Sequence, residues 1–150
     1  MTTKGIIIGV IAFVLLVVIA VGILIGAGVT RWKAALRSGN EAAAVQHLKM
    51  FAMLEIQYFN MHHRTFGTFD QLLKDGSDAR FSGDLPVVDG YTFTLKVMPK
   101  TSSAPASYTL NADPLNNSTG KNHFYLDSTD SSIRVSADRQ ASARDSPLGE

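Results

Sequence analysis

The sequence contains no cysteine among its 150 residues. This absence excludes a disulfide framework, a thiol nucleophile and a cysteine-based zinc site. The chain has the length of one small domain plus an N-terminal segment. A domain of this size without covalent cross-links depends on packing or on neighbouring subunits for its stability.

Acidic residues are absent before Glu41, although the chain holds 13 Asp and Glu in total. Residues 1–40 therefore carry a charge of +4, and residues 41–150 carry −3. The basic residues of the first segment are Lys4, Arg31, Lys33 and Arg37. Because they flank an apolar run, anionic lipid headgroups explain them better than nucleic acid does. We expect a membrane partner and no nucleic-acid partner.

Charge of either sign is absent from Ile6 to Val29, a run rich in Ile, Val, Leu, Ala and Gly. A helix of this length rises about 36 Å, against a bilayer hydrocarbon core of about 30 Å. The run predicts a transmembrane helix over 6–30, after a short leader at 1–5. A cleaved secretory signal is the alternative, although its apolar region has only about 7–15 residues.

Two glycines in the apolar run have the spacing that lets helix backbones approach each other closely. Gly22 and Gly26 form a GxxxG pair, which favours helix association. Glycine is also frequent in transmembrane helices generally, so both interpretations stay open. We take Gly22 and Gly26 as candidate helix-packing residues.

An amphipathic continuation of the helix is predicted over 31–63. Ser38-Gly39-Asn40-Glu41 matches a capping box and indicates either a helix start or a kink in one long helix. From Ala42 to His62, apolar residues cover more than half of the helical circle, which is wider than one sheet needs. We expect a second packing partner, most simply other copies of this helix. The candidate contact residues are Phe51, Tyr58 and Phe59.

Glu55 projects into this apolar arc. A carboxylate in such a place is costly unless it is paired. The pattern therefore predicts either that water reaches Glu55 along a seam in the apolar arc or that Glu55 meets a basic group. We favour the hydrated seam.

The segment 64–135 predicts a loop and a sheet. Thr68-Phe69-Asp70-Gln71 signals a short helix. Alternation with period two predicts strands at 91–97, 108–112 and 123–127 and a short one around Ile133 and Val135. The short connections indicate an antiparallel arrangement. Residues 136–150 show no period and predict a loose tail.

The expected fold class is α+β. A long N-terminal helix, with a transmembrane half and an amphipathic half, is expected to pack on a small antiparallel β-meander of three to four strands.

The sequence contains no recognisable motif of residues that would together hold a metal ion or catalyse a reaction. The adjacent His62 and His63 would diverge by about 100° on a helix, which is poor geometry for a shared metal ion. The loops contain oxygen ligands that suit calcium, but they lack EF-hand spacing. These residues are Asp113, Asn116, Asn117, Asp127 and Asp130. No GxSxG or phosphate-binding glycine motif occurs. We expect no enzyme activity, no cofactor and no metal.

The order of these segments resembles the type IV pilin and pseudopilin superfamily over nearly the whole chain. Lys4-Gly5-Ile6 is similar to the junction that prepilin peptidase cuts in that family. The stretch 58–73, with Thr65-Phe66-Gly67-Thr68-Phe69 inside it, is similar to the helix end and following loop of many pilin-like proteins. The stretches 90–95 and 123–127, with Ile133-Arg134, are similar to the closing strands of the family. The resemblance implies cleavage between Gly5 and Ile6, with a prepilin peptidase and other pilin-like subunits as partners.

Two departures from the family pattern bear on assembly. Typical pilins carry a glutamate at the fifth mature position, where this chain has Val10, and the usual leading phenylalanine is Ile6. The resemblance implies a structural subunit of a type IV pilus, pseudopilus or related surface filament, assembled by packing of N-terminal helices. The alternative is an uncleaved, single-pass membrane-anchored binding or accessory module. Both place the N-terminus in the cytoplasm and the domain beyond the inner membrane.

Overall fold

The computed structural model describes the backbone of residues 3–74 and 78–149. In the first helix, side chains are described at 13–19, at Gly22 and from Val29 onward. The chain divides into two compact units, residues 1–36 and residues 37–150. The described part of the first unit is helical, and the second unit contains the sheet.

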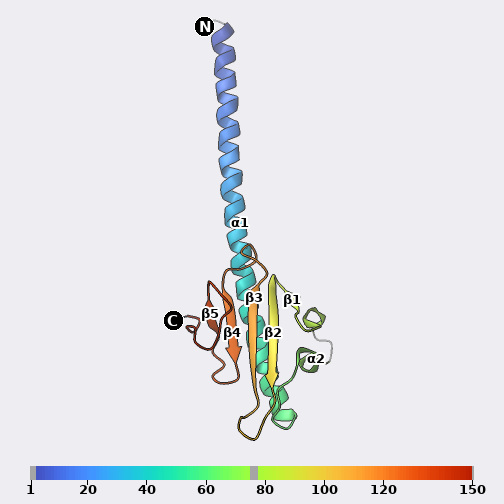
Figure 1. Ribbon diagram of the computed structural model, residues 1–150. Helices are drawn as coiled ribbons and strands as arrows, with labels where there is room; N and C mark the ends of the chain where they lie inside the picture. The colour runs from blue at the N-terminus through green and yellow to red at the C-terminus, as the bar shows by residue number, and fades with distance from the viewer. Residues whose placement is uncertain (1–2, 75–77, 150) are drawn as a thin grey trace. The chain divides into compact units, whose positions relative to one another are not determined.

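The secondary structure is α+β, with one long helix followed by a sheet (Figure 1). Helix α1 is Thr3–Met61, and the short helices α2 and η1 are Phe69–Leu72 and Ala79–Phe81. The strands are β1 (Val87–Val88), β2 (Tyr91–Met98), β3 (Ser107–Pro114), β4 (His123–Asp127) and β5 (Arg134–Ser136). They form one antiparallel sheet in the order β1-β2-β3-β4-β5, so each strand pairs with its neighbour along the chain.

The sheet has five strands, which corrects the expected three to four. Strands β2 to β5 lie where the sequence alternates with period two. The additional strand β1 has only two residues and pairs Val88 with Tyr91 at the edge of the sheet. Two residues are too few for a period to be recognised in the sequence.

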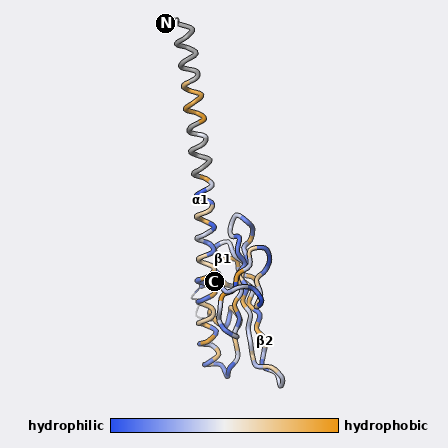
Figure 2. The backbone as a smooth tube through the Cα atoms, turned by 90° about the vertical axis from the view of Figure 1, so that its left-hand side faces the viewer, coloured by the Kyte–Doolittle hydropathy of each residue, from blue (hydrophilic) through white to orange (hydrophobic). Residues whose placement is uncertain are grey.

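The expected transmembrane half of the fold is corrected as well. None of the helices in the described residues combines the length and the apolar character that a membrane crossing requires. Within the described side chains of α1, the longest apolar run is Phe13–Ile19, which is visible as the orange segment in Figure 2.

Helix α1 continues through Ser38-Gly39-Asn40-Glu41 without a break, so the capping-box pattern marks neither a start nor an end. The Glu41 carboxylate turns instead to the connection between β3 and β4. It accepts hydrogen bonds from the Lys121 and Asn122 backbone N–H groups at 2.8 and 3.4 Å and from Asn122 Nδ2 at 2.9 Å. The Glu41 side chain, which the local sequence predicts to cap a helix, therefore makes tertiary contacts instead.

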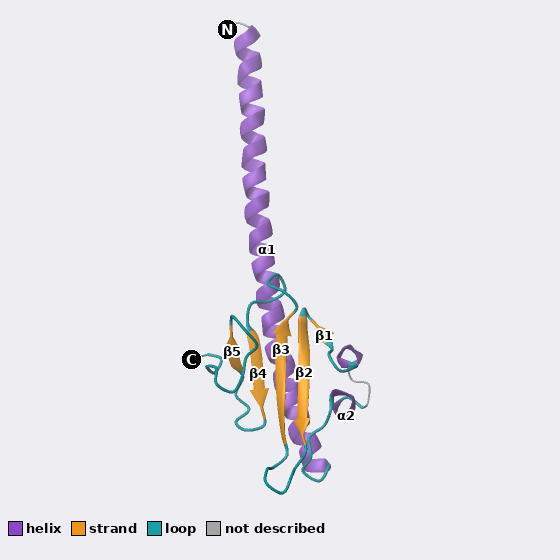
Figure 3. Ribbon diagram, viewed as in Figure 1, coloured by secondary structure: helices purple, strands orange, loops and turns teal. Residues whose placement is uncertain are grey.

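The core of the second unit lies between one stripe of α1 and one face of the sheet (Figure 3). From α1, Ala44, Leu48 and Phe51 are almost completely buried. The sheet contributes alternate side chains, as its period-two pattern requires. These are Val88, Tyr91, Phe93, Tyr108, Leu110, Ala112, Phe124 and Leu126.

Aromatic rings form the centre of this core. Phe81 of η1 meets Phe51 of α1 and Phe93 of β2 edge to face, with ring centroids 4.8 and 5.1 Å apart. Such pairs stabilise by about 0.5–1.5 kcal/mol beyond the area they bury. The Phe81 ring thus packs η1 into the core of the domain.

The C-terminal segment is docked on the domain, in contrast to the loose tail expected for 136–150. Ala141 is buried, and its carbonyl accepts a hydrogen bond of 2.9 Å from Asn111 Nδ2 on β3. The Leu148 N–H donates to the Ile133 carbonyl at 2.7 Å. Pro147 forms an isolated antiparallel β-bridge with Arg134 of β5. The docking uses single polar contacts, which leave no periodic signal in the sequence.

Gly120 permits the closest approach in the sheet domain. A Cβ atom at this position would lie 2.1 Å from the hydroxyl oxygen of Tyr91. That hydroxyl donates a hydrogen bond of 2.9 Å to the Asn122 carbonyl, so it cannot swing away without breaking the bond. The connection between β3 and β4 therefore requires glycine at position 120.

We predict that Gly120→Ala lowers the free energy of unfolding by about 1–3 kcal/mol, because the added methyl overlaps the Tyr91 hydroxyl. The double variant Gly120→Ala/Tyr91→Phe should recover part of the loss. Gly39→Ala is the matched control, because nothing lies within 4 Å of its Cβ position in α1, and it should gain about 0.5–1 kcal/mol. Chemical denaturation measures all three. Wild-type stability for Gly120→Ala would contradict the prediction.

Candidate functional site

The residues predicted to pack helices lie in different settings. Phe51 is completely buried in the core of its own domain, so its ring is not available to another copy. Tyr58 and Phe59 are half-buried, and their rings stack on His62 and Phe66 with centroids 3.8 and 4.8 Å apart. Gly22 has no described atom within 4 Å of its Cβ position. Gly5, Ile6 and Gly26 have side-chain positions outside the described ones.

The described part of the first unit presents a continuous apolar surface. Every side chain from Phe13 to Ile19 is exposed, and the exposed fraction ranges from 43% at Val17 to 70% at Phe13. Seven consecutive positions pass almost twice around a helix, so this surface encircles α1. A helix that is apolar on all sides is normally buried. The first unit taken alone leaves it uncovered.

The second unit also leaves apolar side chains of α1 exposed. Met53, Ile56 and Met61 have exposed fractions of 67%, 54% and 62%. They lie outside the stripe that meets the sheet, which is occupied by residues such as Leu48 and Phe51. On the helix, Met53 lies among exposed polar residues such as Gln57 and Asn60, so these three side chains are separate apolar positions and not one continuous face.

A sharp turn follows α1 and brings the chain back against the helix. His63 and Arg64 have φ values of 53° and 61°, in the left-handed region that non-glycine residues rarely adopt. Each such residue costs roughly 1–2 kcal/mol. The Arg64 N–H donates to the Phe59 carbonyl at 3.1 Å, and Thr65 Oγ1 donates to the His62 carbonyl at 2.6 Å.

Glu55 lies beneath this turn and is completely buried. Its Oε2 accepts a hydrogen bond of 2.9 Å from the Gly67 N–H. Its Oε1 has no hydrogen-bond partner among the residues that the structure describes. Burial raises the pKa of the Glu55 carboxyl to about 7, and the Gly67 bond offsets only part of this shift.

The environment of Glu55 differs from both expectations. In the described part of the chain the carboxylate has neither a hydrated seam nor a basic partner, and the turn from its own domain covers it. The sequence does signal an unusual carboxylate, because Glu55 falls within an apolar arc. It does not identify Gly67 as the partner, because a backbone N–H carries no side-chain signature.

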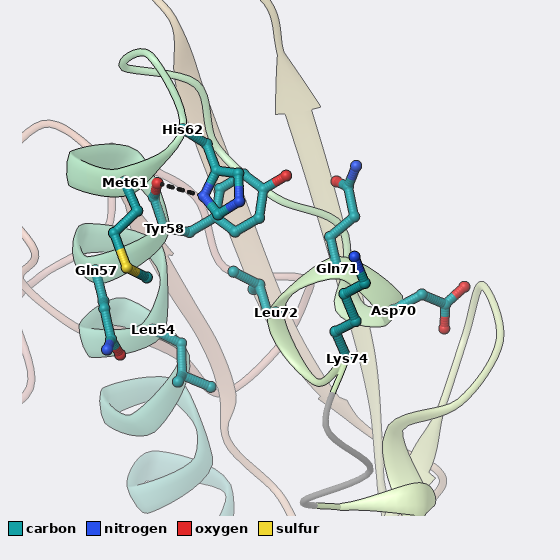
Figure 4. A pocket seen from close by; sticks show the side chains of 9 residues that line it. All are labelled: Leu54, Gln57, Tyr58, Met61, His62, Asp70, Gln71, Leu72 and Lys74. Carbon is teal, nitrogen blue, oxygen red and sulfur yellow. Dashed lines mark hydrogen bonds between the residues drawn. The ribbon is translucent and has the colours of Figure 1, made fainter.

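A groove of about 600 Å³ opens beside this turn, between the end of α1 and α2 (Figure 4). Gln57 and Met61 line one side and Gln71 and Lys74 the other, while Asp70 points away from α1. The full lining is Leu54, Gln57, Tyr58, Met61, His62, Asp70, Gln71, Leu72 and Lys74. Mixed apolar and amide walls suit contacts with another polypeptide.

Helix α2 forms one wall of the groove, and a hydrogen bond from its capping box closes its start. Thr68 precedes the helix, and its N–H donates to Gln71 Oε1 at 2.9 Å. This is the side-chain half of the capping box predicted at Thr68-Phe69-Asp70-Gln71. The cap directs Gln71 back along the helix and fixes the wall next to Gly67.

The described residues contain no group of three or more side chains able to hold a metal ion. Asp113, a candidate calcium ligand, instead meets His123 Nδ1 at 2.6 Å and Gln140 Nε2 at 2.6 Å. Asp130 is likewise paired, with Arg134 Nη2 at 2.7 Å. These carboxylates hold the strands and the C-terminal segment in place.

Comparison with known proteins identifies no relative: no family model, no curated protein and no solved structure matches the chain.

We predict that stability falls as pH rises from about 4.5 to about 7. The folded protein holds the Glu55 proton up to about pH 7, and the unfolded chain releases it near the ordinary value of 4.5. The contribution of the protonated Glu55 to the free energy of unfolding is therefore complete below pH 4.5 and is lost as the pH rises through 7. It amounts to roughly 2–4 kcal/mol. Denaturant midpoints between pH 4.5 and 8.5 measure this decline.

Glu55→Gln should remove this decline and leave a variant more stable than the wild type at pH 8. Glu41→Gln, at the half-buried glutamate of the same helix, should keep the decline because Glu55 remains. An unchanged pH profile in Glu55→Gln would show that another group is responsible.

Proposed function

We propose that the protein is a pilin-like structural subunit of a type IV pilus, pseudopilus or related surface filament, and that its copies assemble by packing their N-terminal helices. The observation that carries this proposal is the exposed apolar surface Phe13–Ile19 in the first unit. Full burial of one such side chain contributes about 1.5–3 kcal/mol. Neighbouring copies of α1 provide a covering surface of matching chemistry.

The second unit supports the same proposal from its own surface. Met53, Ile56 and Met61 are apolar side chains of α1 that the sheet does not cover. Tyr58 and Phe59 are partly exposed as well. Contacts with a neighbouring copy would bury these side chains.

Leu16→Arg should abolish filaments, because burying an unpaired guanidinium between helices costs several kcal/mol. The control is Leu115→Arg, at a leucine that is also exposed but lies beyond β3 in the sheet domain, and it should assemble normally. Negative-stain microscopy of sheared cell-surface fractions gives the readout, with whole-cell immunoblots to show equal accumulation. Normal filaments in Leu16→Arg would contradict helix packing at this surface.

The proposal includes removal of the leader by a prepilin peptidase at the junction of Gly5 and Ile6. Intact-mass measurement of protein isolated from cells should then give a chain that begins at Ile6. A mass that retains residues 1–5 would contradict the processed subunit.

A second candidate function is an uncleaved binding or accessory module outside the cytoplasm. The groove between α1 and α2 favours this candidate, because a purely structural subunit has no need of a recess of about 600 Å³. A retained leader together with an absence of filaments would favour the module over the subunit.

A further inference from the structure

The turn 62–68 has a buried titratable contact, Glu55, where it returns to the domain. Its first half is held to the end of α1 by the Arg64 N–H, which donates to the Phe59 carbonyl, and by His62 Nδ1, which lies 3.1 Å from the Tyr58 carbonyl. Within the turn, Thr65 Oγ1 donates to the His62 carbonyl. Its second half is held by the Phe66 ring, by the Gly67 N–H, which donates to Glu55 Oε2, and by the hydrogen bonds of Thr68 at the start of α2. The two left-handed residues, His63 and Arg64, oppose this closed form.

The surroundings of Glu55 do not stabilise a negative charge. From β3, the buried Tyr108 faces it, and burial together with the charges of Glu55 and Asp127 raises the pKa of the Tyr108 hydroxyl to about 12. The turn contributes His62, His63 and Arg64, and α2 contributes Asp70, all with exposed side chains. Among the described residues, no cationic group forms an ion pair or hydrogen bond with Glu55.

We propose that the turn 62–68 is a pH-responsive strap, which is closed while the Glu55 carboxyl carries a proton and opens when that carboxyl ionises. One N–H donor cannot replace the hydration shell of a buried carboxylate. Ionisation therefore draws water to Oε1, and the turn is the cover that has to move. The strap goes beyond filament assembly and does not depend on it.

Opening of the strap changes two surfaces of the domain. Gly67 is in close contact with Leu72 and Tyr58, since a Cβ at this position would lie 2.9 Å from Leu72 Cδ2 and 3.2 Å from Tyr58 Cγ. Both residues line the groove, so movement of Gly67 alters its floor. Phe66 leaves its contacts with Phe59 and Tyr108 at the same time and exposes apolar surface. The strap therefore couples local pH to the shape of the groove.

The test is a pH titration of the full chain by NMR after selective ¹³C labelling of the glutamate carboxyls. The only glutamates are Glu41, Glu55 and Glu150, so the spectrum is simple. We expect the Glu55 carboxyl to titrate near pH 7 and the Gly67 amide shift to follow with the same midpoint. Hydrogen exchange at the Gly67 amide, corrected for its intrinsic pH dependence, should be at least tenfold less protected at pH 8.5 than at pH 5.5.

Glu55→Gln should hold the strap closed, so that protection of the Gly67 amide is equal at both pH values. Glu41→Gln is the matched control and should respond as the wild type does. The proposal is overturned if protection in the wild type does not change with pH, or if Glu55→Gln shows the same change. If Glu55→Gln does not fold, the wild-type midpoints decide, because different midpoints for Glu55 and Gly67 contradict the strap.

Discussion

The sheet domain depends on the burial of one stripe of α1 against one face of the sheet. Leu48 and Phe51 on this stripe reach the aromatic centre of the core. Each end of the stripe carries a glutamate that accepts a backbone N–H group from a connection outside α1. Glu41 holds the connection between β3 and β4, and Glu55 holds the turn that follows α1. Both connections are thus anchored to α1.

The two glutamates perform the same structural task in different environments. Glu41 is half-buried and has three donors, so its charge is satisfied. Glu55 is completely buried and has one donor, so its charge is costly. A half-buried glutamate with three donors and a completely buried glutamate with one donor therefore hold opposite ends of the same helical stripe.

The features of the fold that the sequence predicts are those with a recognisable residue pattern. Alternation in Tyr91–Met98 and His123–Asp127 is enough to place β2 and β4, and the spacing of Thr68 and Gln71 places α2. The strand β1 is too short to repeat, and the docked C-terminal segment depends on single contacts such as that of Asn111 with Ala141. Long-range contacts of this kind leave no local trace in a sequence.

The candidate site was partly predictable for the same reason. The apolar arc, and the position of the charged Glu55 within it, can be recognised from helical periodicity alone. Periodicity does not say which residues of the arc pack inside the domain and which contact neighbours. It therefore predicts helix packing for Phe51, which belongs to the core. The continuity of α1 through Gly39 was equally undetermined, because Glu41 fits both a cap and a tertiary contact.

The central claim is that neighbouring copies cover the exposed apolar surface of α1. The absence of native cysteine makes single-cysteine oxidative cross-linking in intact cells the most direct measurement. Val17→Cys should give a ladder of cross-linked oligomers, because the residue lies within the exposed run 13–19. Lys96→Cys, on the exposed side of β2, should remain monomeric. Monomers alone for Val17→Cys, or equal ladders for both variants, would contradict the account.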